Sequence, residues 1–365
     1  MEIGAMEQYW VWLSSVEGIG PKRFYQLLSE YEDPRAVWDA AKGGHVQAEG
    51  LGPKTLANLK EACSPAYFYK LFDELERLEI TPVTRISEQY SELLSSIYDA
   101  PPTLYVKGRA DLRLEKPFAI VGTRYPTRDG KRTAEEFAQR LALCGATVVS
   151  GMARGVDTCA HKGCLKEGGR TVAVLGCGVD IAYPPENEGL YREILEAGGT
   201  IVSEYAPGTT PQAQYFPARN RIISGLSEGT LMVEGSLRSG GMITANDCIE
   251  QGRDLFVVPG SIYASMSAGP NSLLMQGAFP AVSPWDIPEH YRWGQRPSKQ
   301  VKEEEISLSP EEAPVVHQLR RQEMTLGELS AETGFPAAKL NSVLTMLELR
   351  GIICKVPGGA YRAIK

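Results

Sequence analysis

Residues 216–250 read FPARN RIISG LSEGT LMVEG SLRSG GMITA NDCIE, and this stretch decides the fold. A helix-like run starts at Arg219-Asn220-Arg221, an apolar strand follows at Gly229–Glu234, and a second helix follows Arg238-Ser239-Gly240-Gly241. Helix, strand, glycine-rich turn and helix in this order form one unit of a parallel α/β sheet. The turn offers free backbone N–H groups and a hydroxyl beside guanidinium groups, the chemistry that holds phosphate oxygens.

Outward from this stretch, similar units repeat along the chain. Five more strands are expected at Phe118–Gly122, Thr147–Gly151, Thr171–Gly176, Thr200–Glu204 and Leu255–Gly260, with a leading strand at Leu104–Gly108. Helical runs separate them at Asp129–Cys144, Val156–Glu167 and Glu188–Ala197. Unbroken apolar strands alternating with helices predict a parallel sheet covered on both faces. Ligands of such sheets bind beyond the carboxyl ends of the strands, where this chain gathers Gly, Ser, Glu and Arg.

Length and composition limit the remaining possibilities. The chain has 365 residues, a net charge of −7 and a pI near 5.4, so we expect two or three domains and no broadly basic surface. Its seven cysteines form no CxxC pair, which argues against a disulfide framework and a thiolate zinc site. No signal-like segment or membrane-length apolar run is present in the sequence. We therefore expect a soluble cytoplasmic protein without a thiolate metal site.

The ends of the chain differ from the middle. Residues 1–80 are expected to be helical, with Val16-Glu17-Gly18-Ile19-Gly20-Pro21-Lys22 repeated as Ala48-Glu49-Gly50-Leu51-Gly52-Pro53-Lys54. This Gly-apolar-Gly-Pro-Lys pattern either presents backbone N–H groups to a DNA phosphate, as helix-hairpin-helix turns do, or merely closes two helical hairpins. Residues 81–288 would form the sheet domain and the polar residues 289–312 a linker.

Residues 313–365 have the pattern of a winged helix. Helices are expected near Ala313–Gln322, Leu326–Thr333 and Pro336–Arg350, and a wing hairpin at Ile352–Val356, Pro357-Gly358-Gly359 and Ala360–Ala363. Between Glu311 and Lys365 seven basic residues stand against six acidic ones. Such a balance lacks the electrostatic footprint of a DNA-groove reader, so protein contact or an orienting role is favoured.

Several candidate residues have both a functional and a structural interpretation. Arg124, after a strand, would bind phosphate or be a surface arginine. Asp157 and His161 would form an acid–base pair or metal site, but helix capping and a buried hydrogen bond are favoured. Arg219 and Arg221 would contact a phosphate backbone or form ion pairs with Glu204 and Glu234. Phe216, preceded by Tyr215, would stack on a base or be buried.

Together these segments resemble the DNA-processing protein A (DprA, or Smf) family. The similarity is carried by Ile120–Arg124, Ser150–Asp157, Gly178-Val179-Asp180 with Tyr183-Pro184, Phe216–Arg221, Ser239–Ala245 and Gly252–Gly260. The resemblance implies an extended Rossmann-like core between an N-terminal helical domain (helix-hairpin-helix or SAM-like) and a C-terminal winged helix. It also implies a non-catalytic homodimer without a cofactor that binds single-stranded DNA, protects incoming DNA and loads RecA recombinase in natural transformation. A single-stranded DNA-binding protein is a further expected partner.

The patterns and the resemblance together predict the site residues. Arg124 stands at the pocket arginine of the family, and lysines that some members carry are replaced by Pro185, Glu188 and Ala213. Three apolar residues at Leu273-Leu274-Met275 suggest a dimer interface that includes Asn271, Leu273 and Leu274. The predicted nucleic-acid contacts are Gly122, Thr123, Arg124, Ser150, Gly151, Arg154, Gly155, Asp157, Phe216, Arg219, Asn220, Arg221, Gly240, Gly241 and Thr244.

Two other functions compete with this one. Ser239–Thr244 with Asp247 resembles in outline the Pro-Gly-Gly-x-Gly-Thr-x-x-Glu loop of nucleoside-monophosphate phosphoribohydrolases, with Ser239 for Pro, Ile243 for Gly and Asp247 for Glu. A dinucleotide-binding module is the other alternative. It is weakened because Gly176-Cys177-Gly178 does not continue as a G-x-G-x-x-G helix start.

Overall fold

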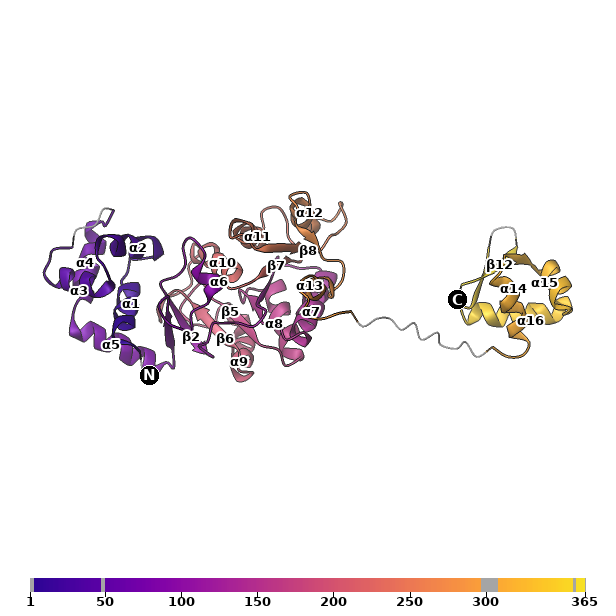
Figure 1. The fold of residues 1–365 in the computed structure, drawn as a ribbon, viewed down its shortest axis with the longest axis horizontal. Helices are drawn as coiled ribbons and strands as arrows, with labels where there is room; N and C mark the ends of the chain where they lie inside the picture. The colour runs from indigo at the N-terminus through magenta and orange to yellow at the C-terminus, as the bar shows by residue number, and fades with distance from the viewer. Residues whose placement is uncertain (1–2, 47–49, 297–307, 357–358, 365) are drawn as a thin grey trace. The chain divides into compact units, whose positions relative to one another are not determined.

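The computed structural model describes residues 3–46, 50–296, 308–356 and 359–364. The chain divides into two compact units, Met1–Arg296 and Pro297–Lys365 (Figure 1). In its described part, the first unit carries the N-terminal helices and a large sheet, and the second carries a small sheet with helices.

The N-terminal part of the first unit is helical. Each of its last four helices begins with proline, whose fixed φ suits a helix start and whose missing N–H would have no helical partner there. Trp12 is fully buried in the centre of this part and donates its indole N–H to the carbonyl oxygen of Ala62 at 2.9 Å. The helices are α1 (Ala5–Ser15), α2 (Pro21–Glu30), α3 (Pro34–Lys42), α4 (Pro53–Ala62) and α5 (Pro65–Arg77).

The first glycine-proline repeat forms the turn between α1 and α2, and the second leads into α4. Ala48 and Glu49 of the second repeat lie outside the described residues. The two repeats are in contact, since Lys54 pairs with Glu17 at 2.8 Å and Asn58 donates to the Glu17 carbonyl oxygen. The turns thus close helical hairpins that pack together.

The large sheet has the strand order β1-β2-β6-β5-β4-β3-β7-β8-β9. Strands from β6 to β9 along this order are parallel, whereas β2 is antiparallel to β6 and β1 is antiparallel to β2. The strands are β1 (Thr81–Thr84), β2 (Thr103–Gly108), β3 (Phe118–Val121), β4 (Val148–Ser150), β5 (Thr171–Val174), β6 (Thr200–Ser203), β7 (Gly229–Met232), β8 (Asp254–Val257) and β9 (Phe279–Pro280).

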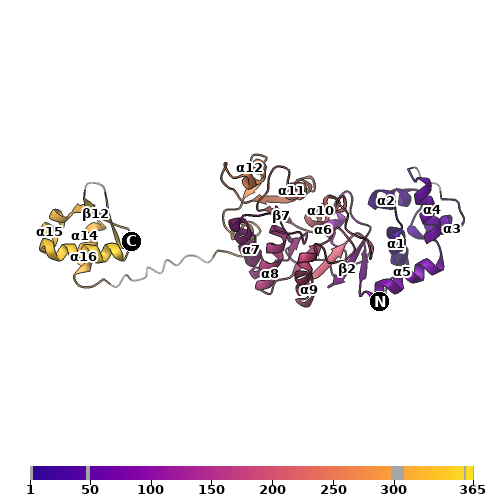
Figure 2. The same cartoon turned by 180° about the vertical axis from the view of Figure 1, so that it is seen from behind.

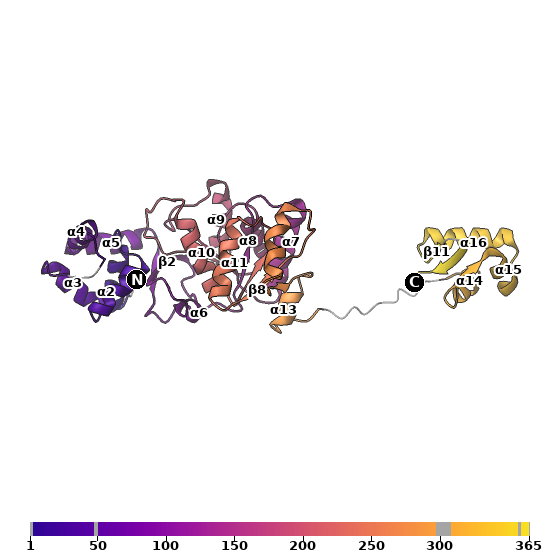
Figure 3. The ribbon, with the colours of Figure 1, turned by 90° about the horizontal axis from the view of Figure 1, so that it is seen from above.

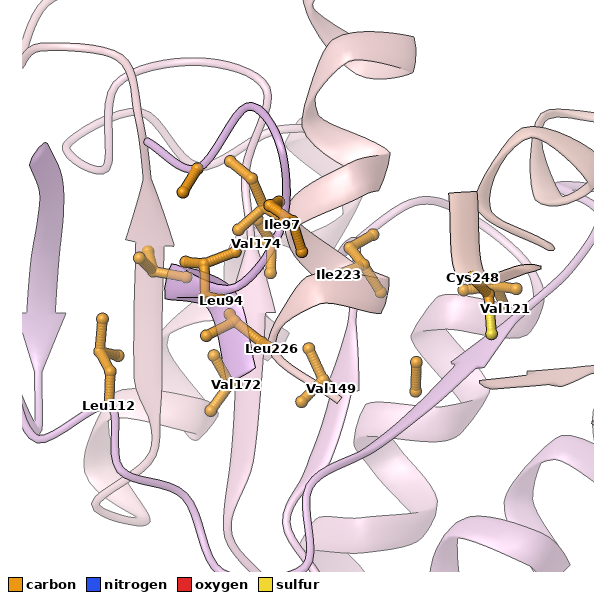
Figure 4. Packing of buried hydrophobic residues seen from close by; sticks show 14 of the residues in the cluster. Leu94, Ile97, Leu112, Val121, Val149, Val172, Val174, Ile223, Leu226 and Cys248 are labelled. Atoms are coloured by element: carbon orange, nitrogen blue, oxygen red, sulfur yellow. The ribbon is translucent and has the colours of Figure 1, made fainter. Parts of the chain in front are cut away.

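Helices cover both faces of this sheet, because alternate residues of each strand point to opposite sides. Val172 and Val174 of β5 belong to the core under α6, α10 and α11, whereas Ala173 belongs to the core under α9 (Figure 4). The helices of this part are α6 (Glu92–Ser95), α7 (Arg128–Leu143), α8 (Val156–Lys166), the 3₁₀ turn η1 (Pro185–Asn187), α9 (Glu188–Glu196), α10 (Tyr215–Gly225), α11 (Gly240–Glu250), the 3₁₀ turn η2 (Ser265–Ser267), α12 (Ala268–Leu274) and α13 (Asp286–His290).

Two layers of helices result. α10 and α11 lie on one side of the sheet and α7, α8 and α9 on the other, as the front and back views show (Figures 1 and 2). Figure 3 views the unit from the side of α10 and α11. The chain runs outward from β3 to β6, then returns to place β7 on the other side of β3. This reversal makes a topological switch point between β3 and β7, the usual position of a ligand site.

The six strands predicted for the parallel sheet are present, each somewhat shorter at its carboxyl end. The sheet is mixed, because the predicted leading strand β2 runs antiparallel to β6 and pairs in turn with the antiparallel edge strand β1, which the sequence did not indicate. Pro82 in β1 sits on the edge strand, where no ladder hydrogen bond is missed. The helix expected to start at Arg219 begins at Tyr215, so Arg219-Asn220-Arg221 lies in its middle.

The second unit has the predicted winged-helix elements. Thr325 and Glu328 form a capping box at the start of α15, and Gly334 ends it with φ of 70°. The elements are α14 (Glu312–Leu319), β10 (Met324–Thr325), α15 (Leu326–Thr333), α16 (Ala337–Leu349), β11 (Ile353–Lys355) and β12 (Ala360–Ala363), with the strand order β10-β12-β11. Pro357 and Gly358 of the expected wing lie outside the described residues.

The expected linker 289–312 is wrong at both ends. Tyr291 and Trp293 stack with ring centroids 4.6 Å apart and pack against the sheet core, so residues up to 296 belong to the first unit. Ser309 donates to and accepts from Glu312 at the start of α14, and Leu308 packs against the winged-helix core. Residues 297–307 lie outside the described residues.

Candidate functional site

A cleft of about 470 Å³ opens at the switch point between β3 and β7. We call it the switch-point cleft. Its walls are the loops that follow β3, β4 and β7, the start of α11, and one face of α10. Among the predicted site residues, those that line it are Gly122, Thr123, Arg124, Asp157, Phe216, Arg219, Asn220, Gly240, Gly241 and Thr244.

The floor of this cleft is backbone. A Cβ atom on Gly241 would lie 3.0 Å from the Cα atom of Gly122, so these two glycines let the start of α11 meet the loop after β3. Gly155 has a φ of 82°, and a Cβ atom there would overlap the carbonyl oxygen of Thr123. It therefore joins the loops after β3 and β4 in a conformation that favours glycine.

Arg124 is the exposed cation of the switch-point cleft. Its guanidinium carbon lies 5.8 Å from the centre of the Phe216 ring. Within the described parts of the chain it forms no ion pair. Its charge is therefore not cancelled by a bonded carboxylate and is directed to whatever occupies the cleft.

Arg219 is a different kind of arginine. Its side chain is buried, with the residue only 4% exposed, and its Nη1 donates to the carbonyl oxygens of Gly151, at 2.8 Å, and Val174. Burial lowers the pKa of Arg219 to about 10, while the nearby Asp157 carboxylate opposes that shift, so it stays charged at neutral pH. It joins the ends of β4 and β5 to α10 and lends a fixed positive charge to the cleft wall.

We expected Asp157 to cap its own helix, and it does not. Its Oδ2 accepts from the N–H groups of Gly151, at 3.1 Å, and Ala153, at 3.3 Å, and the residue before the first turn of α8 is Gly155. Burial raises the pKa of Asp157 to about 6, and the neighbouring Arg219 guanidinium counteracts this. Asp157 thus holds the loop after β4 in shape and titrates just below neutrality.

His161 has the expected structural role. Its Nδ1 lies 2.7 Å from the hydroxyl of Thr171 in a fully buried position, and burial lowers its pKa to about 3. Among the described residues, no three His, Cys, Asp or Glu side chains are arranged to hold a metal ion. His161 and Asp157 therefore make separate hydrogen bonds and form no acid–base pair.

Aromatic rings line the cleft beside Arg124. Phe216 is half-buried and stacks on Tyr183 with ring centroids 5.4 Å apart. Tyr125, next to Arg124, is 75% exposed and also lines the cleft. Neither tyrosine was among the predicted contacts, although Tyr125 follows the Gly-Thr-Arg motif directly. An aromatic residue beside a loop arginine is the signal that would have found it.

The start of α11 supplies hydrogen-bond donors. Ser239 precedes the helix, its hydroxyl makes no capping bond, and Gly240 and Gly241 stand in the first turn, whose N–H groups have no helical acceptor. The positive end of a helix attracts anions. Arg124, Arg219 and this helix start each make the potential in the cleft more positive. Asp157 is the one carboxylate among the lining residues that opposes them.

Three predicted contacts lie beside or beneath the cleft. The Ser150 hydroxyl is buried and donates to the Ile120 carbonyl oxygen at 2.7 Å, so it joins β4 to β3. Gly151 and Arg154 line a smaller recess of about 90 Å³ that shares Arg124 and Phe216 with the cleft. Arg154 is paired there with Glu186.

Arg221 forms the ion pair with Glu204 that was the structural interpretation of this residue, and it does not join Arg124. It donates to Glu204 through Nη1 and Nη2 at 2.9 and 2.7 Å, and its Nε lies 2.7 Å from Asp99. It faces a second cleft of about 610 Å³, which we call the hairpin cleft because the α1–α2 turn forms one wall. Glu234, the other expected ion-pair partner, instead accepts from the N–H and hydroxyl of Thr127.

The apolar segment expected at a dimer surface is mostly internal. Leu273 is 0% exposed and belongs to the sheet core, and Leu274 is half-buried against that core. Asn271 donates to and accepts from the backbone of Gly260. Met275 alone of the three apolar residues is freely exposed, at 89%. The prediction that Leu273 and Leu274 form an exposed face is therefore wrong.

The loop that resembles a phosphoribohydrolase motif lines the cleft only in part. Asp247, which stands where phosphoribohydrolases carry their glutamate, does not line it. Burial raises the pKa of Asp247 to about 6, and the neighbouring Glu250 carboxylate adds to that shift.

Within the described ranges, no helix is both long and apolar enough to cross a membrane.

Comparison with known proteins gives consistent matches. Residues 81–292 match the family model for DNA recombination-mediator protein A, and residues 299–359 match the DprA winged helix domain. The chain is 32% identical to protein Smf of Synechocystis over 98% of both chains. It is 38% identical to protein Smf of Escherichia coli, over 76% of this chain and 75% of that one.

Two solved structures are also similar. The crystal structure of DNA processing protein A from Streptococcus pneumoniae aligns with a TM-score of 0.65 and 33% identity, over 79% of this chain and 98% of that one. The structure of DNA processing protein A from Helicobacter pylori aligns with a TM-score of 0.52 and 30% identity, over 59% of this chain and 96% of that one. The latter was described for its single-stranded DNA binding mode.

Proposed function

The chain belongs to the DNA recombination-mediator protein A (DprA/Smf) family, and from that premise we propose that it binds single-stranded DNA in the switch-point cleft. The observation that carries the proposal is the exposed Arg124, free of any ion pair in the described residues and set beside Phe216. A single strand needs cations for its phosphates and flat aromatic faces for its bases, and this cleft offers both.

Each wall of the cleft has a part in the proposed binding. Arg124 and the first-turn N–H groups of α11 would bind phosphate oxygens, and Phe216, Tyr125 and Tyr183 would stack on bases. Arg219 would act through its fixed charge, because both carbonyl contacts keep its guanidinium inside the wall. Gly240 has no heavy atom within 4 Å of the position of a Cβ atom, so a phosphate could approach the backbone closely there.

The test is a titration of a labelled oligothymidylate at several salt concentrations. For single strands the logarithm of affinity falls with the logarithm of salt by about 0.7 per phosphate contacted. Arg124→Ala should weaken binding about tenfold, flatten that slope by about one contact, and leave the free energy of unfolding within about 0.5 kcal/mol of wild type. Arg132→Ala, an exposed arginine on α7, is the matched control. Wild-type affinity and slope in a folded Arg124→Ala protein would contradict the assignment.

We propose further that the protein protects incoming DNA and loads RecA recombinase on it during natural transformation, as the family resemblance implies. Support for this comes from the family match to recombination mediators. The measurement is the lag before RecA filaments form on strands covered by a single-stranded DNA-binding protein. This chain should shorten the lag, and Arg124→Ala should not.

A homodimer is part of the same proposal. Because Leu273 and Leu274 of α12 pack against the core, the variant that tests it must be chosen from the exposed residues. Leu274→Glu would disturb the core, so the informative variant is Met275→Glu, whose side chain is exposed. Light scattering should give a dimer for wild type and a monomer for the variant.

A phosphoribohydrolase is the competing activity, and incubation with nucleoside monophosphates should release no free base.

A further inference from the structure

The hairpin cleft is larger than the switch-point cleft and is bounded by two parts of the first unit. One wall is the α1–α2 turn, residues 14–22, and the other is the loop after β6 with the outer face of α10. Hydrogen bonds tie the α1–α2 part to β2 and the segment before it. The Ser14 and Thr103 hydroxyls lie 2.9 Å apart, and the Tyr25 hydroxyl donates to the Ala100 carbonyl oxygen at 3.1 Å. The cleft is therefore a formed feature of the unit.

The two clefts meet at the first turn of α10. Phe216 lines the switch-point cleft and Tyr215 lines the hairpin cleft, although neighbouring Cα atoms are only about 3.8 Å apart. Each ring packs against a tyrosine from the loop after a neighbouring strand. Phe216 pairs with Tyr183 after β5, and Tyr215 pairs with Tyr205 after β6, with 4.2 Å between the latter two centroids. The first turn of α10 thus carries one aromatic pair on each side.

The charges of the two clefts differ. In the hairpin cleft Arg221 is neutralised by Glu204 and Asp99, and Glu17 is neutralised by Lys54. Lys22 is the lining cation that, in the described residues, has no ion-pair partner. A cleft so nearly neutral attracts a run of phosphates weakly. Its stacked tyrosines still offer a flat surface to a base, which needs no charge.

We propose that the hairpin cleft is a second subsite for the same DNA strand, which crosses the first turn of α10 and stacks a base on the Tyr205–Tyr215 pair. The inference rests on the proposed function, because the strand enters from the switch-point cleft. It also gives the α1–α2 turn a role, since Lys22 would contact the phosphate next to that base. The alternative occupant is a basic segment of a protein partner, because Glu204 and Asp99 together carry one more charge than the Arg221 that they share.

The experiment compares oligothymidylates of about four and about 16 nucleotides, which bracket the site sizes of single-strand-binding domains. A short strand occupies only the switch-point cleft, whereas a long one reaches both. Tyr215→Ala should weaken binding of the long strand about tenfold and leave the short strand unchanged. Tyr215→Phe should restore long-strand binding, because stacking needs the ring and not the hydroxyl. Lys22→Ala, on a different element, should weaken only the long strand, by about threefold.

Tyr69→Ala is the matched control, since this exposed tyrosine on α5 lines neither cleft. Equal weakening of both strands by Tyr215→Ala would mean damage to Phe216 and would overturn the inference, as would unchanged binding of both. Unchanged DNA binding would leave the cleft to a basic protein segment. A wild-type protein that binds neither strand would instead refute the proposed function, and the inference with it. Salt separates the subsites again, because the part lost in Tyr215→Ala should depend little on ionic strength.

Discussion

Arg219 and Arg221 stand two residues apart on α10 and serve opposite sides of it. Two residues turn a helix by about 200°, so the two side chains point in nearly opposite directions. Arg219 faces the switch-point cleft, is buried and bonds to carbonyl oxygens, whereas Arg221 faces the hairpin cleft and is neutralised by two carboxylates. The Arg-Asn-Arg motif is therefore two sites, and only its first half adds net positive charge to a cleft.

The largest effect should come from removing the buried arginine. Arg219→Ala leaves the carbonyl oxygens of Gly151 and Val174 without this donor and removes the positive charge beside the buried Asp157 carboxylate. We expect the free energy of unfolding to fall by about 3 kcal/mol, measured by urea denaturation. Arg238→Ala, an exposed arginine after β7, should change it by less than about 0.5 kcal/mol. Equal stability of the two variants would remove the distinction between buried and exposed arginines.

Arg221→Ala should have a smaller effect on stability and none on the switch-point cleft. It strands Glu204, whose side chain is only 8% exposed, so we expect a loss of about 2 kcal/mol. Adding Glu204→Gln should recover part of that loss, because the unpaired charge is gone. Binding of the short oligothymidylate should be unchanged in both. A weaker short-strand complex would place Arg221 with Arg124 after all.

The winged helix should contribute little to single-strand affinity. Lys339, Arg350 and Arg362 are paired with Glu311, Glu312 and Glu323, so the near balance of charge in the sequence is local pairing in the structure. Deleting residues 300–365 should change affinity by less than about threefold, or 0.7 kcal/mol. A tenfold loss in a folded truncation would show that this neutral unit binds DNA.

Acidity should give the smallest effect. The pKa of Asp157 is raised to about 6 in the folded protein from an ordinary 3.8, so the folded state gains a proton first as pH falls. As the pH falls from about 6 to 4, protonation of Asp157 therefore increases the free energy of unfolding. As the pH rises through 6, this contribution to stability is lost. Protonation also removes the carboxylate opposed to Arg219. Oligothymidylate should bind about twofold tighter at pH 5.5 than at 7.5, and Asp157→Asn should abolish that difference.

The sequence predicted those parts of the fold that depend on local pattern. Apolar strands such as Thr171–Val174 and helix starts such as Ser239-Gly240-Gly241 are predictable from the sequence. The reason is that hydrophobic periodicity and the residues that begin or end a helix are properties of short segments. β1 and β9 were missed, since a short edge strand at Thr81–Thr84 or Phe279–Pro280 is defined by its partner and not by its own residues.

The sequence predicted which residues belong to the site better than it predicted which side chains share one face of a helix. Arg124 and Phe216 lie together as expected, whereas Arg221 and Leu273 do not have the surroundings that their residue types suggested. A shift of the helix start from Arg219 to Tyr215 is enough to change which side chains share a face. Burial of Leu273 depends on strands far away in the sequence, which no local pattern reports.

The backbone floor at Gly122, Gly155 and Gly241 has a consequence for how this cleft can evolve. The three positions tolerate no added carbon without moving α8 or α11, so the shape of the floor is inherited as a unit. The rim residues Arg124, Tyr125 and Ala213 are exposed and support nothing beneath them. Lineages can therefore exchange cations and rings along the rim while the floor stays fixed.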